Sequence, residues 1–192
     1  TNSFSPTFKQ RRRGLLFILF IGLIIFVWQL GTTGLVDETP PLFAAASRAM
    51  AETGNWLTPQ VNGLPRFDKP PLIYWLMGMG FSMPGNISWD PLGTWAARLP
   101  SALSTILLML VLGDTMMKYP QEENHFNRRT AVVTALVFAL SPLVIIWGRI
   151  AVSDALLCST LGISLLLKWR RFANPGGEVW WLSWIFLSLA VL

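Results

Sequence analysis

Two carboxylates follow the first apolar run of the chain. In a chain that crosses a membrane they would lie at its surface, where charged side chains usually have a function. Asp37 and Glu38 come just after the 22 residues from Gly14 to Leu35, a run long enough to cross a bilayer. In the loop of a soluble domain such a pair is most often solvated surface charge. At a membrane surface it suits general base catalysis, in which a fixed carboxylate accepts the proton of an attacking hydroxyl group.

A second cluster of charge stands about thirty residues further along, where the chain turns apolar again. Lys69 precedes Pro70 and Pro71, whose rigid backbone would hold its ammonium group at the level of lipid headgroups. At that level the compact positive charge of the lysine could bind the phosphate group of a lipid. The alternative is a surface ion pair between Asp68 and Lys69, which would contribute little. Asp68 and Asp37 are also candidate ligands of a divalent metal. Whether the protein uses a metal cofactor therefore stays open.

Four more charged residues are candidates for the same site. Arg149 and Asp154 bracket the short turn between the third and fourth apolar runs, where they either cap helices and pair with each other or complete a site, Asp154 as a catalytic acid. Arg48 and Arg98 fall on the same side of the predicted membrane. Each suits either lipid headgroups or a substrate phosphate.

The composition is that of a polytopic membrane protein rather than a soluble domain. Hydrophobic residues make up 53% of the 192 residues and charged ones only 13%, so much of the surface must face lipid. The net charge of +5 comes largely from basic residues that flank apolar runs and orient membrane helices, so it does not indicate a nucleic-acid partner. The sequence has no Gly-rich phosphate loop and no Cys/His zinc pattern, which disfavours nucleotide cofactors.

Five apolar runs predict an all-α polytopic membrane protein with about five transmembrane helices. The predicted order is a basic N-terminus at 1–13, spans at 14–36, 92–117, 131–148 and 152–169, and the start of a fifth at 179–192, beyond which we expect the polypeptide to continue. Ten Lys and Arg residues lie on the side of the N-terminus, in 9–13, 118–129 and 168–171, and five lie on the other side. The positive-inside rule therefore places the N-terminus and the loop 118–130 in the cytoplasm, and the loop 37–91 with the candidate residues outside.

The first outer loop, residues 37–91, is too long for a hairpin connection and too apolar for a free loop. We expect it to contain two short helices that lie at the membrane interface. Thr39 is a predicted cap followed by two prolines of a first turn, and Gly54 predicts the end of that helix. The second helix should start with Pro70-Pro71 and end near Pro84-Gly85, so it is too short to span the bilayer.

Several blocks of residues together resemble a known family. The chain resembles the C-type membrane glycosyltransferases, and more narrowly bacterial relatives of the lipid A aminoarabinose transferase and of the protein O-mannosyltransferases. The resemblance runs from about residue 14 to residue 160. It rests on Asp37-Glu38, Gly54-Asn55-Trp56-Leu57-Thr58-Pro59, Asn62-Gly63-Leu64, Phe67-Asp68-Lys69-Pro70-Pro71-Leu72, Tyr74-Trp75 and Ala97-Arg98-Leu99-Pro100-Ser101.

The resemblance implies transfer of a sugar from a polyprenyl-phosphate donor to a lipid or protein acceptor outside a bacterial cytoplasmic membrane. The first-loop carboxylate of the family corresponds to Asp37, which would deprotonate or orient the acceptor, and the Asp after the third span corresponds to Asp154. The lysine before the two prolines corresponds to Lys69, which with Arg149 would stabilise the departing phosphate. Attack from the opposite face would invert the anomeric carbon. Where relatives often carry Glu before that lysine, this chain has Asp68, which leaves the identity of donor and acceptor open.

Two other classes compete with a transferase. The first is a non-catalytic membrane subunit that keeps this fold and serves as a scaffold or lipid-binding partner of a larger complex. The second is a transporter, which the clustering of charge at one surface disfavours, because transporters usually carry charges along their spans.

Overall fold

The described part of the chain is mostly helical. A computed structural model describes residues 8–85, 90–119, 127–175 and 180–192. Its elements are α1 (Phe8–Gly22), the π-helix η1 (Leu23–Val27), α2 (Thr39–Thr53), β1 (Gln60–Val61), β2 (Leu64–Pro65), α3 (Leu72–Phe81), α5 (Thr94–Lys118), α6 (Asn127–Ala139), α7 (Pro142–Arg149), α8 (Asp154–Ala173) and α9 (Trp181–Val191). The two short strands pair as one antiparallel hairpin. The predicted predominance of helix therefore holds.

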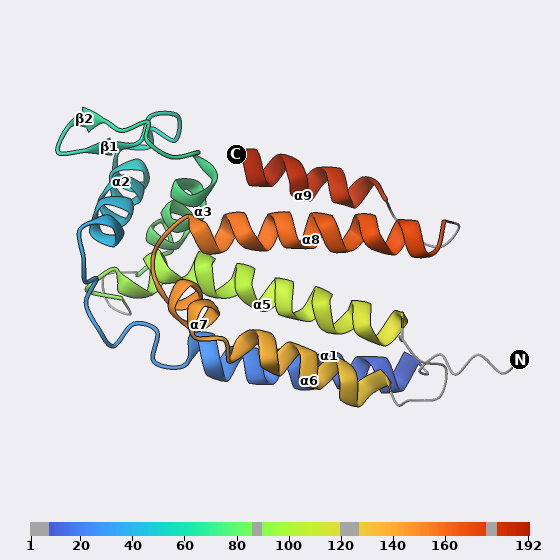
Figure 1. Cartoon of the computed structure of the whole chain (residues 1–192). Helices are drawn as coiled ribbons and strands as arrows, with labels where there is room; N and C mark the ends of the chain where they lie inside the picture. The colour runs from blue at the N-terminus through green and yellow to red at the C-terminus, as the bar shows by residue number, and fades with distance from the viewer. Residues whose placement is uncertain (1–7, 86–89, 120–126, 176–179) are drawn as a thin grey trace, which may run out of the picture.

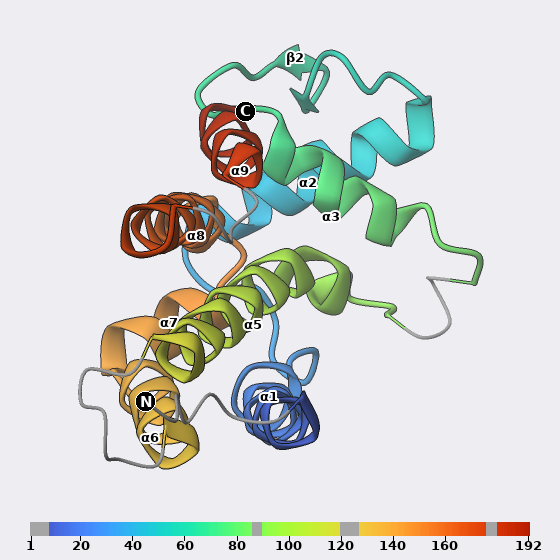
Figure 2. The same cartoon turned by 90° about the vertical axis from the view of Figure 1, so that its right-hand side faces the viewer.

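Helix α5 runs through the centre of the bundle. It contacts α1, α6, α7 and α8, and α9 packs on α8. Figure 1 shows α2, α3 and the hairpin gathered at one end of the bundle, with the start of α1 at the other. Figure 2 shows α1 and α6 on one side of α5, and α8 and α9 on the other. The elements of the predicted outer loop therefore lie together at one end.

The first apolar run does not form one straight helix over residues 14–36. Helix α1 begins earlier, at Phe8, so the basic residues lie inside it, and the helical part ends with η1 at Val27. Gln29 then takes a positive φ of 54°, which a helix cannot continue through. The chain from Trp28 to Glu38 is therefore an irregular segment.

The third apolar run, predicted as one span at 131–148, is bent by 68° between α6 and α7. The bend lies at Ser141, whose ψ of 126° is extended. Pro142 follows it, and a proline both lacks a backbone N–H and disfavours the helical conformation of the residue before it. A single proline therefore explains the break.

The number of spans stays a prediction. By length and composition, α5 is the helix of the described residues that could cross a bilayer, and the bent pair α6–α7 adds a second if it counts as one span. Helices α5 and α8 match the predicted runs 92–117 and 152–169 within a few residues. Helix α3 has 10 residues, fewer than the roughly 17 that a span needs. Helix α9 lies within residues 179–192, the predicted start of a fifth span. The predicted cytoplasmic loop 118–130 lies mostly outside the described residues.

The helices of the first outer loop form where the prolines and the glycine place them. Helix α2 ends at Gly54, whose φ of 71° is left-handed and whose N–H donates to the Met50 carbonyl. Thr39 is its first helical residue rather than its cap, a position that Glu38 takes without a side-chain capping bond. A buried cluster that includes Phe43, Met50, Tyr74 and Met77 packs α2 on α3 and on the start of α5. Each such buried side chain contributes about 1.5–3 kcal/mol.

Candidate functional site

An arginine at the end of α7 holds the irregular segment where it leaves η1. Arg149 donates to the carbonyl oxygens of Ile25 at 2.5 Å and of Trp28 at 2.9 Å. These carbonyls lie where the α-helical pattern breaks and need other donors. Of the alternatives that the sequence leaves open for Arg149, a pair with Asp154 is not found: among the described residues no ion pair joins the two, and Arg149 donates to the backbone instead.

A second arginine, on α5, holds the next part of the same segment. The side chain of Arg98 donates to three carbonyl oxygens and to one hydroxyl group, at 2.8–3.0 Å. A planar guanidinium group can donate to these four acceptors at once, whereas the single ammonium group of a lysine could not reach all of them. The acceptors are the carbonyls of Leu30, Thr33 and Gly34 and the Thr33 hydroxyl.

The segment so held ends at the first candidate carboxylate. Asp37 has a φ of 82°, a conformation that a non-glycine residue adopts only at a cost of roughly 1–3 kcal/mol. Its Oδ1 atom accepts a hydrogen bond of 2.8 Å from the backbone N–H of Glu38. Both residues are exposed, and they lie directly before the first turn of α2, where the helix dipole favours negative charge. The structure thus presents Asp37 as an exposed carboxylate on a fixed backbone.

Asp68 is fully engaged by residues that the sequence analysis did not single out. The guanidinium group of Arg66 donates to both of its oxygens, through Nε at 2.7 Å and through a terminal nitrogen at 2.5 Å. The Tyr74 hydroxyl donates to it at 3.1 Å. Burial raises the pKa of the Asp68 carboxyl, but the hydrogen bonds from Arg66 and Tyr74 outweigh it and hold that pKa below its ordinary value. Asp68 is therefore an ionised anchor of the hairpin, and its partner is Arg66 rather than Lys69.

Lys69 and Asp154 line one cavity of about 130 Å³. Lys69 comes from the stretch before α3, and Asp154 is the first residue of α8, so two segments far apart in the sequence supply opposite charges to the same space. Pro70 and the ends of α8 and α9 form the apolar remainder of the wall. Lys69 is exposed and Asp154 half-buried. A cavity with an ammonium group and an apolar wall can hold the phosphate of a lipid.

The structure links this cavity to the Asp37 segment through shared packing. Leu35, two residues before Asp37, and Leu156, which lines the cavity, both pack against the α2–α3 cluster. The candidate residues Asp37, Lys69 and Asp154 therefore lie at the same end of the bundle, which is the arrangement that the topology argument requires.

Arg48 lies apart from this group. Its guanidinium group sits over the ring of Phe81, 5.1 Å from the centroid, and against Gly93 at the start of α5. The side chain is a packing partner of α3 and α5 there, and neither Lys69 nor Asp154 is among its contacts.

The donor set at this end does not fit the metal site considered from the sequence. Both oxygens of Asp68 accept from Arg66, so they have little capacity left for a cation. Within the described residues no three His, Cys, Asp or Glu side chains come together.

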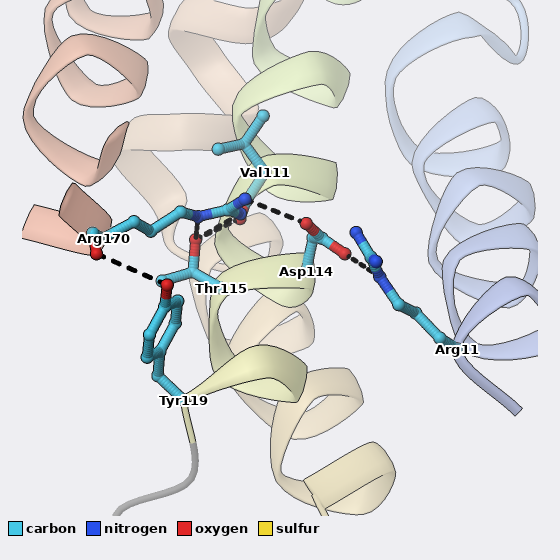
Figure 3. Close-up of polar contacts among 6 residues, drawn as sticks. All are labelled: Arg11, Val111, Asp114, Thr115, Tyr119 and Arg170. Carbon is cyan, nitrogen blue, oxygen red and sulfur yellow. Dashed lines mark hydrogen bonds and ion pairs between the residues drawn. The ribbon is translucent and has the colours of Figure 1, made fainter. Parts of the chain in front are cut away.

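A second buried polar cluster lies at the other end of the bundle, as Figure 3 shows. Asp114 accepts from Arg11 at 2.6 Å and from Arg170 at 3.0 Å, so one carboxylate joins α1, α5 and α8. Arg170 also donates to the hydroxyl group of Thr115 and the carbonyl of Val111. In the sequence, the sign of this cluster is Asp114, a single acid near the end of an apolar run. Because a buried carboxylate needs a cationic partner, such an acid predicts a buried ion pair.

Comparisons with known proteins point to one family. The family model described as dolichyl-phosphate-mannose-protein mannosyltransferase matches residues 68–192, which is more than half of the chain. An uncharacterised protein of Aquifex aeolicus is 31% identical over 186 residues, which cover 94% of this chain and 39% of that protein. The undecaprenyl phosphate-alpha-4-amino-4-deoxy-L-arabinose arabinosyl transferase 1 of Pseudomonas fluorescens is 26% identical over 94% of this chain and 31% of its own length.

Solved structures share the fold. The crystal structure of ArnT from Cupriavidus metallidurans bound to undecaprenyl phosphate has a TM-score of 0.73 with this chain, at 24% identity, and the match covers 92% of this chain and 31% of that one. The chain thus spans about a third of the length of these relatives. These matches confirm the resemblance derived from the sequence blocks. The chain belongs to the dolichyl-phosphate-mannose-protein mannosyltransferase family, whose members are membrane glycosyltransferases of the C-type fold.

Proposed function

We propose that this chain carries the catalytic carboxylate and the phosphate-binding lysine of an enzyme that transfers a sugar from a polyprenyl-phosphate donor to a lipid or protein acceptor. The reaction would take place on the extracytoplasmic face of a bacterial cytoplasmic membrane. The observation that supports this most is the cavity that Lys69 and Asp154 share, at the end of the bundle where the Asp37 segment is fastened.

In this proposal each residue has a separate task. Asp37 accepts the proton of the acceptor hydroxyl group as that group attacks the anomeric carbon. Lys69 stabilises the negative charge that develops on the departing lipid phosphate. Asp154, across the same cavity wall, orients the lysine or the sugar. Attack opposite to the leaving phosphate inverts the anomeric carbon.

Arg98 and Arg149 receive a task that was not among the alternatives left open by the sequence. Because their guanidinium groups are occupied by backbone carbonyls of residues 25–34, we assign them to the positioning of Asp37 rather than to the substrate phosphate. Arg66 has the corresponding task for the stretch that carries Lys69, since it fixes the neighbouring Asp68.

The test is transfer of a radiolabelled sugar from a polyprenyl-phosphate donor, assayed with the whole gene product in membranes. Asp37→Asn should lower kcat by about a thousandfold or more while the protein stays folded, because a carboxylate base is lost. Lys69→Gln should lower it by roughly a hundredfold, the usual effect of losing one charge-stabilising donor. The matched control is Glu52→Gln, an exposed acid on α2 that lies outside the cavity.

Retained turnover in Asp37→Asn would contradict the catalytic assignment. A wild-type protein that binds polyprenyl phosphate but transfers no sugar would favour the scaffold or lipid-binding subunit instead.

A further inference from the structure

A groove opens between α1 and α6, at the end of the bundle away from Lys69 and Asp154. Its volume is about 470 Å³. Three arginines line it, Arg13 from α1 and Arg128 and Arg129 from α6, together with the apolar side chains of Phe17, Val132 and Val133. Among the described residues that line it, none is an acid. Figure 2 shows the two helices side by side on one flank of α5.

The direction of Arg13 follows from helix geometry. Successive residues of a helix are about 100° apart, so Arg11 and Arg13 point to nearly opposite sides of α1. Arg11 is bound to Asp114 of α5, as Figure 3 shows. That contact fixes the rotation of α1 and leaves Arg13 facing the groove on the α6 side.

The arginines of α6 make the groove strongly attractive for an anion. Arg128 and Arg129 lie in the first turn of α6, which contains no acid. The N-terminus of a helix is the positive end of its dipole. Two cationic side chains there make the local electrostatic potential still more positive. An anion at this position is stabilised by the dipole and by the guanidinium groups of Arg13 and Arg129, and guanidinium groups bind phosphate oxygens in pairs.

The groove continues as two apolar stripes. Phe17 and Phe20 of α1 are 50% and 60% exposed, and Ile24 of η1 is 48% exposed. Val133 and Val137 of α6 are 57% and 68% exposed, and Leu140, directly after α6, is 58% exposed. The spacings of three and four residues place the residues of each set on one side of the helical stretch. Two parallel stripes that start at a cationic pocket fit a ligand with one anionic phosphate and two hydrocarbon chains.

We propose that this groove binds an anionic glycerophospholipid of the host membrane. The phosphate and the charged headgroup would lie against Arg13 and Arg129, and one acyl chain would follow each stripe. The pair of stripes favours a two-chain lipid over a polyprenyl phosphate, which has a single chain. This site is separate from the proposed catalytic cavity and does not depend on it.

Native mass spectrometry of the delipidated full-length protein, titrated with phosphatidylglycerol, tests the proposal. Arg13→Gln and Arg129→Gln should each weaken binding about fivefold, as expected for one basic side chain at an anionic lipid surface. The matched control is Arg12→Gln, which removes the same charge one residue away, outside the groove. It should leave binding within twofold of the wild type. Val133→Trp should reduce binding without any change of charge, because it fills the groove at an exposed position.

Four results would overturn the proposal. The first is an equal loss in Arg12→Gln and Arg13→Gln, which would show attraction by net charge alone. The others are equally tight binding of phosphatidylcholine, displacement of the lipid by millimolar inorganic phosphate, and tighter binding of undecaprenyl phosphate at the same groove. Asp37→Asn should bind phosphatidylglycerol normally, so a failure of the catalytic proposal leaves this one testable.

Discussion

Replacement of Arg98 by glutamine should separate a positioning role from a substrate-binding role. The substitution removes four hydrogen bonds from a charged donor to the segment that ends at Asp37. Three of the four are exposed, so water replaces part of what is lost, and we expect the free energy of unfolding to fall by about 2–3 kcal/mol. For a unit of this size that corresponds to a decrease in Tm of roughly 5–10 °C.

The kinetic effect should be larger than the effect on stability. A segment released from Arg98 would let Asp37 move by about 1 Å or more, and such a displacement of a catalytic group costs roughly a hundredfold in rate. Because no contact to the donor phosphate is lost in this proposal, KM should change by less than about threefold. The assay is steady-state transfer from a polyprenyl-phosphate donor, alongside a thermal unfolding curve of the same preparation.

Two companion variants make the result interpretable. Arg98→Lys keeps the charge but cannot reach all the acceptors, so it should recover little of the lost kcat. Arg48→Gln removes an exposed guanidinium group that stacks on Phe81, and it should leave kcat nearly unchanged. The reasoning is refuted if Arg98→Gln raises KM by tenfold or more at an unchanged kcat, or if Arg98→Lys restores full turnover.

Three further predictions concern stability and topology. Asp68→Asn should remove the part of the acid sensitivity of Tm that appears below about pH 4, because the lowered pKa of Asp68 gives a contribution that is complete above the unfolded-state pKa and disappears as the carboxylate is protonated. With the side chain 46% exposed, the loss at neutral pH should not exceed about 1 kcal/mol. Asp114→Asn should cost about 3 kcal/mol, measured as a lower Tm, because it leaves the buried guanidinium group of Arg170 without a counter-charge. In a background free of native cysteine, an impermeant maleimide applied from outside should label Glu52→Cys but not Arg12→Cys, and the reverse result would invert the proposed orientation.

The features that sequence reasoning located are those encoded by neighbouring residues. The two prolines after Thr39 and the glycine at position 54 set the bounds of α2, since each acts on the backbone within one turn. Lys69 and Asp154 were expected on one side of the membrane from the alternation of apolar runs, and they line one cavity. Local backbone chemistry, such as a proline or a glycine at a helix end, can thus be read without knowledge of packing, and the number of spans stays a prediction.

The features that sequence reasoning missed depend on contacts between distant residues. Nothing near Arg149 indicates that its acceptors lie 124 and 121 positions earlier. Arg66 also went unnoticed, because a bidentate pair with Asp68 requires the hairpin to turn the two side chains toward each other. The break at Ser141 could have been read from the proline after it, but the apolar run on both sides favoured a single span.

The dependence of the Asp37 segment on Arg98 and Arg149 also sets an order in biogenesis. The acceptor carbonyls at residues 25–34 leave the ribosome long before their donors, and at roughly 5–20 residues per second the 124 residues between Ile25 and Arg149 take about 6–25 s to synthesise. During that interval the segment has no fixed conformation, because its backbone groups must bind water or other transient partners. In the proposed orientation, Asp37 would therefore be exported early and fixed in place only later, once α7 lies beside η1.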